Sequence, residues 1–294
     1  MGNPPLLELG TLKLAGSAAA QSLADPGWFF TDLGDWGALP DSKSDIRERP
    51  QANGADEIAT DWRQSLAYSV KGMFLGSSHA DVQSAKGVIK RAIGGGKSIP
   101  VAVTDVDGRF TRVSSVRSFV PADDRGRALF TFTLDLIAFD PCMYGEPVTV
   151  STGVPVQGGG LVWPLGSTPG VYWDWGADGS SGRVTLPNGG TAESWPTVTA
   201  SGGLGGGFVA TAVNGSTVRS VRFERVIPDG SLVSIDFRTG RAWIDAPGND
   251  VSGFLTVRDF FSVPAGGSTD IQFAPLGVVS GTPQFTATVS PAFL

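Results

Sequence analysis

The single histidine, His79, has the broadest chemical repertoire of any residue in this chain. A zinc site built from several histidines, or from cysteines and histidines, needs more ligands than one His and one Cys supply. A Ser-His-Asp triad would have to use His79, yet the chain contains no G-x-S-x-G nucleophile elbow. Because His79 stands in the polar first turn of an expected helix, we interpret it as an exposed residue without a catalytic role.

Residues 94–98 read GGGKS and look like the end of a phosphate-binding loop. The complete G-x-x-x-x-G-K-[ST] pattern requires glycine at position 91, where this chain has Arg91. The stretch also follows an expected helix, whereas a phosphate-binding loop follows a strand and opens a helix. The pattern therefore predicts a helix end and a turn, with Gly94 as the C-cap.

Residues 105–108 read DVDG and look like the start of a calcium loop. The closing Glu of such a loop is missing, because residues 110–116 contain no carboxylate, so we expect a hairpin turn instead. Any two acids can meet in space to cleave a glycosidic bond, but no pair stands out in the sequence. We therefore predict no catalytic residue, no metal site and no cofactor, and we predict that the protein is not an enzyme.

Two aromatic clusters carry the remaining potential for binding. The first lies in a Gly- and Asp-rich stretch that is predicted to be a long loop; its large side chains are costly to leave in water, so they should dock on this chain or another. Its members are Trp28, Phe29, Phe30 and Trp36. The second cluster has two interpretations, stacking on a sugar or packing of a loop on its own sandwich or a partner. Its members are Trp163, Tyr172, Trp173 and Trp175.

The composition describes a β-rich chain without a basic surface. Of 294 residues, 41% are hydrophobic, 17% are charged and 41 are glycine, which is typical of a packed, loop-rich β protein rather than a disordered one. The net charge of −6 argues against nucleic-acid binding as the main role. The lone Cys142 excludes an intrachain disulfide. We see no apolar run long enough for a membrane span and no signal peptide, so synthesis in the cytoplasm is expected.

The second half of the chain reads as short strands separated by turns. One face of each expected strand is apolar, as at Val221 and Phe223, and again at Val233, Ile235 and Phe237. The sequence 214–216, NGS, matches a glycosylation acceptor, but it also suits a tight hairpin, and we favour the turn. Regular strands and turns with one polar face predict an antiparallel β-sandwich.

The first half mixes strands with one helix. Residues 65–76 alternate like a strand, and a helix is expected from Ser78 to Ile93, with Ser78 as N-cap and an apolar stripe. The stripe comprises Val82, Ala85, Val88, Ile89, Ala92 and Ile93. Further strands follow, the last with one apolar face formed by Phe130, Phe132, Leu134 and Leu136. This order predicts an α+β first domain, residues 1–141, and a second domain, residues 142–294.

Several stretches, in order along nearly the whole chain, resemble the distal tail protein of long, flexible-tailed bacteriophages, often called simply phage tail protein. In the first half the resemblance rests on RPQANG at 49–54, the strand and helix that follow, the strands IPVAV and VSSV, and the closing LIAFDP. In the second half it rests on SWPTVTASG, DGSLVSIDFRTGRAW and FFSVPAGGSTDIQF.

The resemblance implies a mainly β protein: an α+β first domain with one helix packed on a β-sandwich or split barrel, followed by a galectin-like antiparallel β-sandwich. It implies a structural virion protein, a minor tail protein made in the host bacterial cytoplasm. Residues 1–141 would form a closed ring, usually a hexamer, that joins the tail tube to the tip or baseplate and continues the DNA channel. Residues 142–294 would face outward.

The partners implied are other copies of the chain, the tail tube protein, the tape measure protein and the hub proteins of the tail tip or baseplate. DNA would pass through without specific binding, and no membrane insertion is expected. Trp28, Phe29, Phe30 and Trp36 become a candidate contact between subunits or with the tube. Trp163, Tyr172, Trp173 and Trp175 become a candidate outward docking or glycan patch.

Two alternatives stay open. A carbohydrate-binding module that recognises a host cell-wall glycan is favoured by the galectin-like pattern and by the second aromatic cluster. Galactoside-binding galectins use His, and residues 142–294 contain none, which favours a structural or docking role for the sandwich. A glycoside hydrolase with a lectin-like sandwich would need an acid pair, and the sequence marks none.

Overall fold

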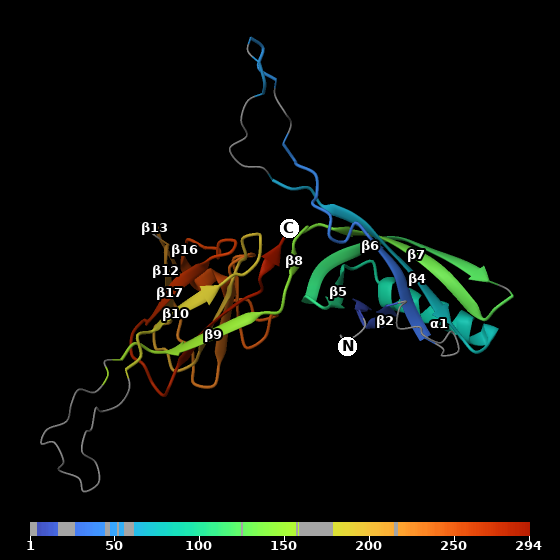
Figure 1. The fold of residues 1–294 in the computed structure, drawn as a ribbon. Helices are drawn as coiled ribbons and strands as arrows, with labels where there is room; N and C mark the ends of the chain where they lie inside the picture. The colour runs from blue at the N-terminus through green and yellow to red at the C-terminus, as the bar shows by residue number, and fades with distance from the viewer. Residues whose placement is uncertain are drawn as a thin grey trace, which may run out of the picture. The chain divides into compact units, whose positions relative to one another are not determined.

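The computed structural model divides the chain into two compact units. The described residues are 5–16, 27–44, 48–51, 53–55, 62–124, 126–156, 158, 179–214 and 217–294. Unit 1 comprises Met1–Glu146 with Phe293–Leu294, and unit 2 comprises Pro147–Ala292 (Figure 1). The division falls after residue 146 rather than 141 because β8 (Met143–Tyr144) still pairs with a strand of unit 1, through Thr111 and Tyr144.

Unit 1 is built on a closed β-barrel of seven strands. The order around the barrel is β6-β5-β1-β2-β3-β4-β7, and β6 also pairs with β7, which closes it. β8 and β19 (Ala292–Phe293) extend the sheet beyond β6. The expected sandwich or split barrel is thus corrected to a closed barrel. Its strands are β1 (Leu6–Leu9), β2 (Leu12–Gly16), β3 (Gly27–Gly34), β4 (Leu66–Leu75), β5 (Ile99–Asp105), β6 (Gly108–Asp124) and β7 (Leu129–Ala138).

The length of β6 explains why the barrel closes. Its residues 108–114 pair with β5, and its residues 115–124 pair with β7. The register shifts between Val116 and Ser118, which marks a β-bulge, and a bulge bends its strand and increases the local twist. β6 therefore pairs with β5 along its first half and with β7 along its second half, and these two pairings close the barrel.

The helix α1 (His79–Ile93) begins and ends where the sequence predicts. The Ser78 hydroxyl accepts a hydrogen bond from the Asp81 amide at 3.2 Å, and the Asp81 carboxylate accepts one from the Ser77 amide at 3.1 Å. Gly94 is the C-cap. Val88 was placed wrongly in the apolar stripe: it lies on the flank of the buried face and is 38% exposed. The buried members are Val82, Ala85, Ile89 and Ile93.

The barrel interior is filled by alternate residues of its strands. On β7 the predicted inward residues are all buried, which confirms the alternation: Phe130, Phe132, Leu134 and Leu136. Gly72 on β4 leaves room for them, because a Cβ there would lie 2.5 Å from the Phe132 ring. Burial of side chains of this size contributes about 1.5–3 kcal/mol each.

Unit 2 is a sandwich of two five-stranded antiparallel sheets, ordered β10-β17-β12-β13-β16 and β15-β14-β11-β18-β9. The first sheet contains β10 (Arg183–Pro187), β12 (Phe208–Asn214), β13 (Thr217–Phe223), β16 (Leu255–Arg258) and β17 (Ser268–Pro275). The second contains β9 (Val148–Gly153), β11 (Thr197–Ser201), β14 (Leu232–Asp236), β15 (Arg241–Ile244) and β18 (Gln284–Val289). A 3-10 turn, Ser252–Phe254, precedes β16.

The two sheets of unit 2 face each other across one apolar core. Phe273 of β17 stacks on Phe285 of β18, with ring centroids 5.0 Å apart and planes 7° from parallel. The residues predicted to face inward are buried, which confirms the strand pattern of this half: Val221, Phe223, Val233, Ile235 and Phe237. Both inner faces therefore contribute to a single core, as in other packed sandwiches.

Candidate functional site

The first aromatic cluster does not lie in a long loop. Trp28, Phe29 and Phe30 belong to β3, which pairs with β4 along its length, so the loop prediction was wrong for residues 27–34. Phe29 and Phe30 are each 9% exposed. The Trp28 ring packs 4.8 Å from Phe74 and 5.9 Å from Phe130, measured between centroids. These side chains therefore pack within unit 1, and their contact with a subunit or tube stays a prediction.

Trp36, the fourth member of that cluster, covers a buried polar centre. Arg112, 2% exposed, lies with its guanidinium carbon 4.8 Å from the Trp36 ring centroid. Its Nη1 donates to the Trp36 carbonyl at 2.8 Å, and its Nη2 donates to the Pro141 carbonyl at 2.7 Å. Its Nε, also buried, has no hydrogen-bond partner in the part of the chain that the structure describes. Arg112 thus ties two irregular segments to the barrel.

Tyr68 completes this centre from β4. Its hydroxyl is 2.7 Å from the Ser114 hydroxyl, and both residues are buried. Burial raises the pKa of Tyr68 to about 12, and burial also lowers the pKa of Arg112. The phenol stays neutral at physiological pH, and a guanidinium stays charged. The centre is therefore structural. Alternation along β6 places Arg112 and Ser114 on its buried face, and this alternation is the sequence signal that identifies them.

The second aromatic cluster, Trp163, Tyr172, Trp173 and Trp175, lies outside the described residues. Its two interpretations therefore both remain predictions.

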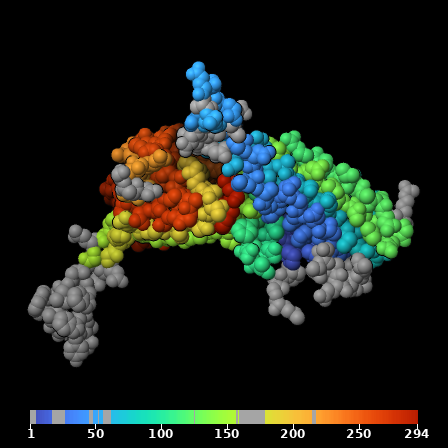
Figure 2. All heavy atoms as spheres, turned by 45° about the horizontal axis from the view of Figure 1, so that its top comes forward, coloured from blue at the N-terminus to red at the C-terminus, as the bar shows by residue number. Residues whose placement is uncertain are grey.

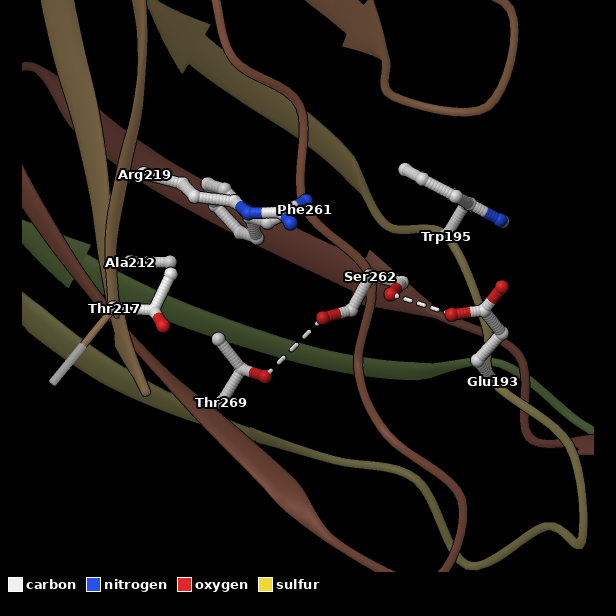
Figure 3. Close-up of a pocket in the computed structure, with 8 residues that line it drawn as sticks. All are labelled: Glu193, Trp195, Ala212, Thr217, Arg219, Phe261, Ser262 and Thr269. Carbon is white, nitrogen blue, oxygen red and sulfur yellow. Dashed lines mark hydrogen bonds between the residues drawn. The ribbon is translucent and has the colours of Figure 1, made fainter. Parts of the chain in front are cut away.

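A cleft of about 390 Å³ lies at one end of unit 2. Figure 3 shows Arg219, Ala212 and Thr217 along one side, Trp195 and Glu193 along the other, and further side chains between them. The residues between the two sides are Phe261, Ser262 and Thr269. The lining therefore combines one cation, one anion, three hydroxyl groups and two aromatic rings.

The two stretches of the first half that look like ligand-binding loops form a helix end and a hairpin turn. Residues 94–98 follow the end of α1, and residues 105–108 form the hairpin between β5 and β6, as predicted. Among the described residues there is no group of three or more His, Cys, Asp or Glu that could hold a metal ion. Over those same residues, no helix has the length and apolar character needed to cross a membrane.

Among solved structures, proteins of phage adsorption apparatus and phage baseplates have a similar fold. The crystal structure of SPP1 Dit (gp 19.1), described as a paradigm of the hub adsorption apparatus in phages that infect Gram-positive bacteria, matches with a TM-score of 0.60 and 16% identity. The match covers 93% of this chain and 96% of that one.

The phage p2 baseplate, in its activated conformation with Ca, matches with a TM-score of 0.55, 11% identity and 98% coverage of both chains. The same baseplate with Sr matches with a TM-score of 0.54, 11% identity and 97% coverage of both chains. No family model and no curated protein matches the chain. At these identities the likeness establishes a shared fold across both units.

Proposed function

We propose that this chain is a structural virion protein at the distal end of a long, flexible phage tail. The observation that carries the proposal is the whole-length match to SPP1 Dit, which includes both units in one order. A likeness limited to a sandwich would fit many unrelated proteins, since common folds host many functions. We do not propose an enzymatic activity. Unit 2 would be the galectin-like sandwich that faces outward.

In the proposed assembly, six copies close a ring through heterologous contacts and continue the DNA channel. The ring would join the tail tube to the tip or baseplate, with the tape measure and hub proteins as further partners. The net charge of −6 suits a channel through which DNA passes without specific binding.

The outer face of the barrel supports a subunit contact. A hollow of about 380 Å³ lies over β4 and β7, between Ala67, Ser69, Asp135 and Arg117. The outward side chains of β4 and β7 beside it are short at Ala67, Ser69, Thr131 and Thr133, with Lys71 and Met73 between them. Figure 2 shows the described residues of unit 1 as spheres, coloured from blue to green. We place one face of the ring contact here.

Native mass spectrometry of the full chain tests the ring. The expected species has six times the 30.5 kDa chain mass. Ala67→Arg should shift the distribution to monomer, because a long charged side chain would enter the close contact. Val278→Arg is the control, since Val278 is 81% exposed in unit 2. If Ala67→Arg still forms the ring, the subunit contact does not lie on this face. If the wild-type chain is a monomer, the ring proposal itself is wrong.

A further inference from the structure

The inner face of one sheet in unit 2 changes character towards one end of the strands. On β13, Phe223 and Val221 face the core and are fully buried, whereas the next two positions on that face, Arg219 and Thr217, are exposed. On β17, the inward series ends at Thr269. Arg219 and Thr217 are exposed and Thr269 is buried, so the core ends at this level of the strands and the polar positions beyond it line an open cleft.

The lining combines charged, hydroxyl and aromatic side chains. Arg219 supplies guanidinium donors, Glu193 supplies carboxylate acceptors, and Thr217 and Ser262 supply hydroxyl groups that do both. Trp195 adds an apolar aromatic surface with a negative face. Asp259 lies 4.0 Å from Arg219 Nε, so the acids at the cleft outnumber its one cation and no excess positive charge is present to hold a phosphate. A neutral ligand with an apolar C–H face and a rim of hydroxyl groups matches this lining, and a pyranose sugar has that form.

The walls of the cleft are held in place before any ligand arrives. The segments that carry Glu193 and Ser262 are joined by backbone hydrogen bonds between Ser194 and Val263, at 3.0 and 2.7 Å. The Ser262 hydroxyl donates to Glu193 at 2.9 Å. On the opposite side, Arg219 Nη1 donates to the Phe260 carbonyl at 3.1 Å. A site supported in this way loses little conformational entropy on binding.

The base of the cleft is continuous with the core. Phe261 is 3% exposed and packs edge-on against Phe237, with ring centroids 4.8 Å apart. The Thr269 hydroxyl donates to the Ser262 carbonyl at 3.4 Å. At about 390 Å³, the hollow falls within the range of roughly 300–1,000 Å³ of small-molecule sites.

We propose that this cleft binds a neutral pyranose unit of a saccharide. Trp195 would pack against the C–H face of the ring, while Arg219 and Glu193 would hold its hydroxyl groups from opposite sides. The site differs in every residue from the glycan patch expected from the sequence. It lies within unit 2 and does not depend on the proposed ring, so either proposal can fail without the other.

Saccharide titration of the full chain tests the site. The probes are glucose, galactose, mannose, rhamnose and N-acetylglucosamine, with N-acetylneuraminic acid and glucose 6-phosphate as charged comparators, followed by saturation-transfer NMR and calorimetry. We expect at least one neutral sugar to bind. Arg219→Ala and Glu193→Ala should each weaken that binding about tenfold or more, because each removes hydrogen bonds to a charged group.

Two further variants keep the test specific. Thr217→Trp fills the cleft from an exposed position and should abolish binding while the far-UV circular dichroism stays unchanged. Arg183→Ala is the matched control, since Arg183 lies on the outer face of the same sheet, in an ion pair with Asp270 at 2.6 Å. The proposal is overturned if no neutral sugar binds at millimolar concentration, if only the charged sugars bind, or if binding survives Thr217→Trp.

Discussion

Each unit holds irregular segments in place with one buried polar side chain, which is charged in unit 1 and neutral in unit 2. In unit 1, Arg112 ties the segments at Trp36 and Pro141 to the barrel, but its Nε has no partner among the described residues. In unit 2, Asn188, 1% exposed, ties three segments together and uses all of its hydrogen-bonding groups. Its amide nitrogen lies 2.8–3.3 Å from the carbonyls of Ala192, Val263 and Pro264, and its oxygen accepts from the amides of Gly190 and Ala292.

We expect the charge of a buried group to be a poor guide to its contribution to stability. Burying a guanidinium costs desolvation that two carbonyl contacts offset only in part. A neutral amide costs less to bury, and a saturated one leaves no group unpaired. We therefore expect the neutral anchor to stabilise its unit more than the charged anchor does.

Replacing the neutral anchor should have the largest effect. Asn188→Leu leaves the amides of Gly190 and Ala292 and the carbonyl of Ala192 without this partner in a buried place, whereas the carbonyls of Val263 and Pro264 still accept from backbone amides. The expected loss is about 4 kcal/mol of the unfolding free energy of unit 2. Hydrogen exchange of amides in β11 and β17 measures it unit by unit, since two units need not unfold together.

Asn249→Ala is the control for this variant, because Asn249 is exposed, and it should change stability by less than about 0.5 kcal/mol. A loss of that small size in Asn188→Leu would mean that Asn188 anchors nothing.

Replacing the charged anchor should have a smaller effect. Arg112→Met keeps the apolar stem but loses both carbonyl contacts, and relief of the buried charge offsets part of that loss, so we expect about 2 kcal/mol in unit 1. Arg112→Lys should be no better, because a single ammonium does not reproduce the planar fork of a guanidinium. Hydrogen exchange in β4 and β7 gives the value. If Arg112→Met costs more than Asn188→Leu, the comparison is reversed.

Tyr68 should give unit 1 a dependence on alkaline pH. Burial raises its pKa to about 12, above the unfolded value of about 10. The folded state therefore keeps a proton that the unfolded state has lost, and stability that is complete below about pH 10 falls as pH approaches 12. Tyr68→Phe should flatten this slope and cost about 1 kcal/mol at neutral pH through the lost bond to Ser114. Urea unfolding across this range measures both, and an unchanged slope in the variant would assign the dependence to other groups.

The smallest expected effect concerns Asp270 on the surface of unit 2. A hydrogen bond from Thr185 is the largest single cause of the lowered pKa of Asp270, and Arg183 lowers this pKa further through its charge and a hydrogen bond. Thr185→Val and Arg183→Ala should therefore each raise the pKa of Asp270 towards its ordinary value. NMR titration of the carboxyl measures this. The small stability that the lowered pKa contributes is present at neutral pH and is lost as pH falls through that pKa. An unchanged pKa of Asp270 in either variant would contradict the assignment.

The strands were predictable where one face is apolar and one is polar. The inward series of β7 and β14, and both ends of α1, follow directly from alternation and capping. The strand at residues 27–34 was missed because its partner, β4, lies more than thirty residues away, and its Gly- and Asp-rich composition is typical of loops. Closure of the barrel was also missed, since it depends on pairings of β6 with two strands at once.

The cleft in unit 2 was only partly predictable. Arg219 and Thr217 continue the alternation of Val221 and Phe223, so the sequence alone places two polar residues on the face of the strand that carries the core residues, and the structure leaves them exposed. That Glu193 and Trp195 lie opposite them depends on the backbone pairing of Ser194 with Val263, two segments about seventy residues apart. Such contacts are set by the assembled sandwich and leave no local pattern.

Electron microscopy of the purified full chain tests the central proposal most directly. Class averages are predicted to show a closed ring of six copies around an open channel, with unit 2 outside. Single, unassociated molecules at every concentration examined would contradict a role in building the tail end.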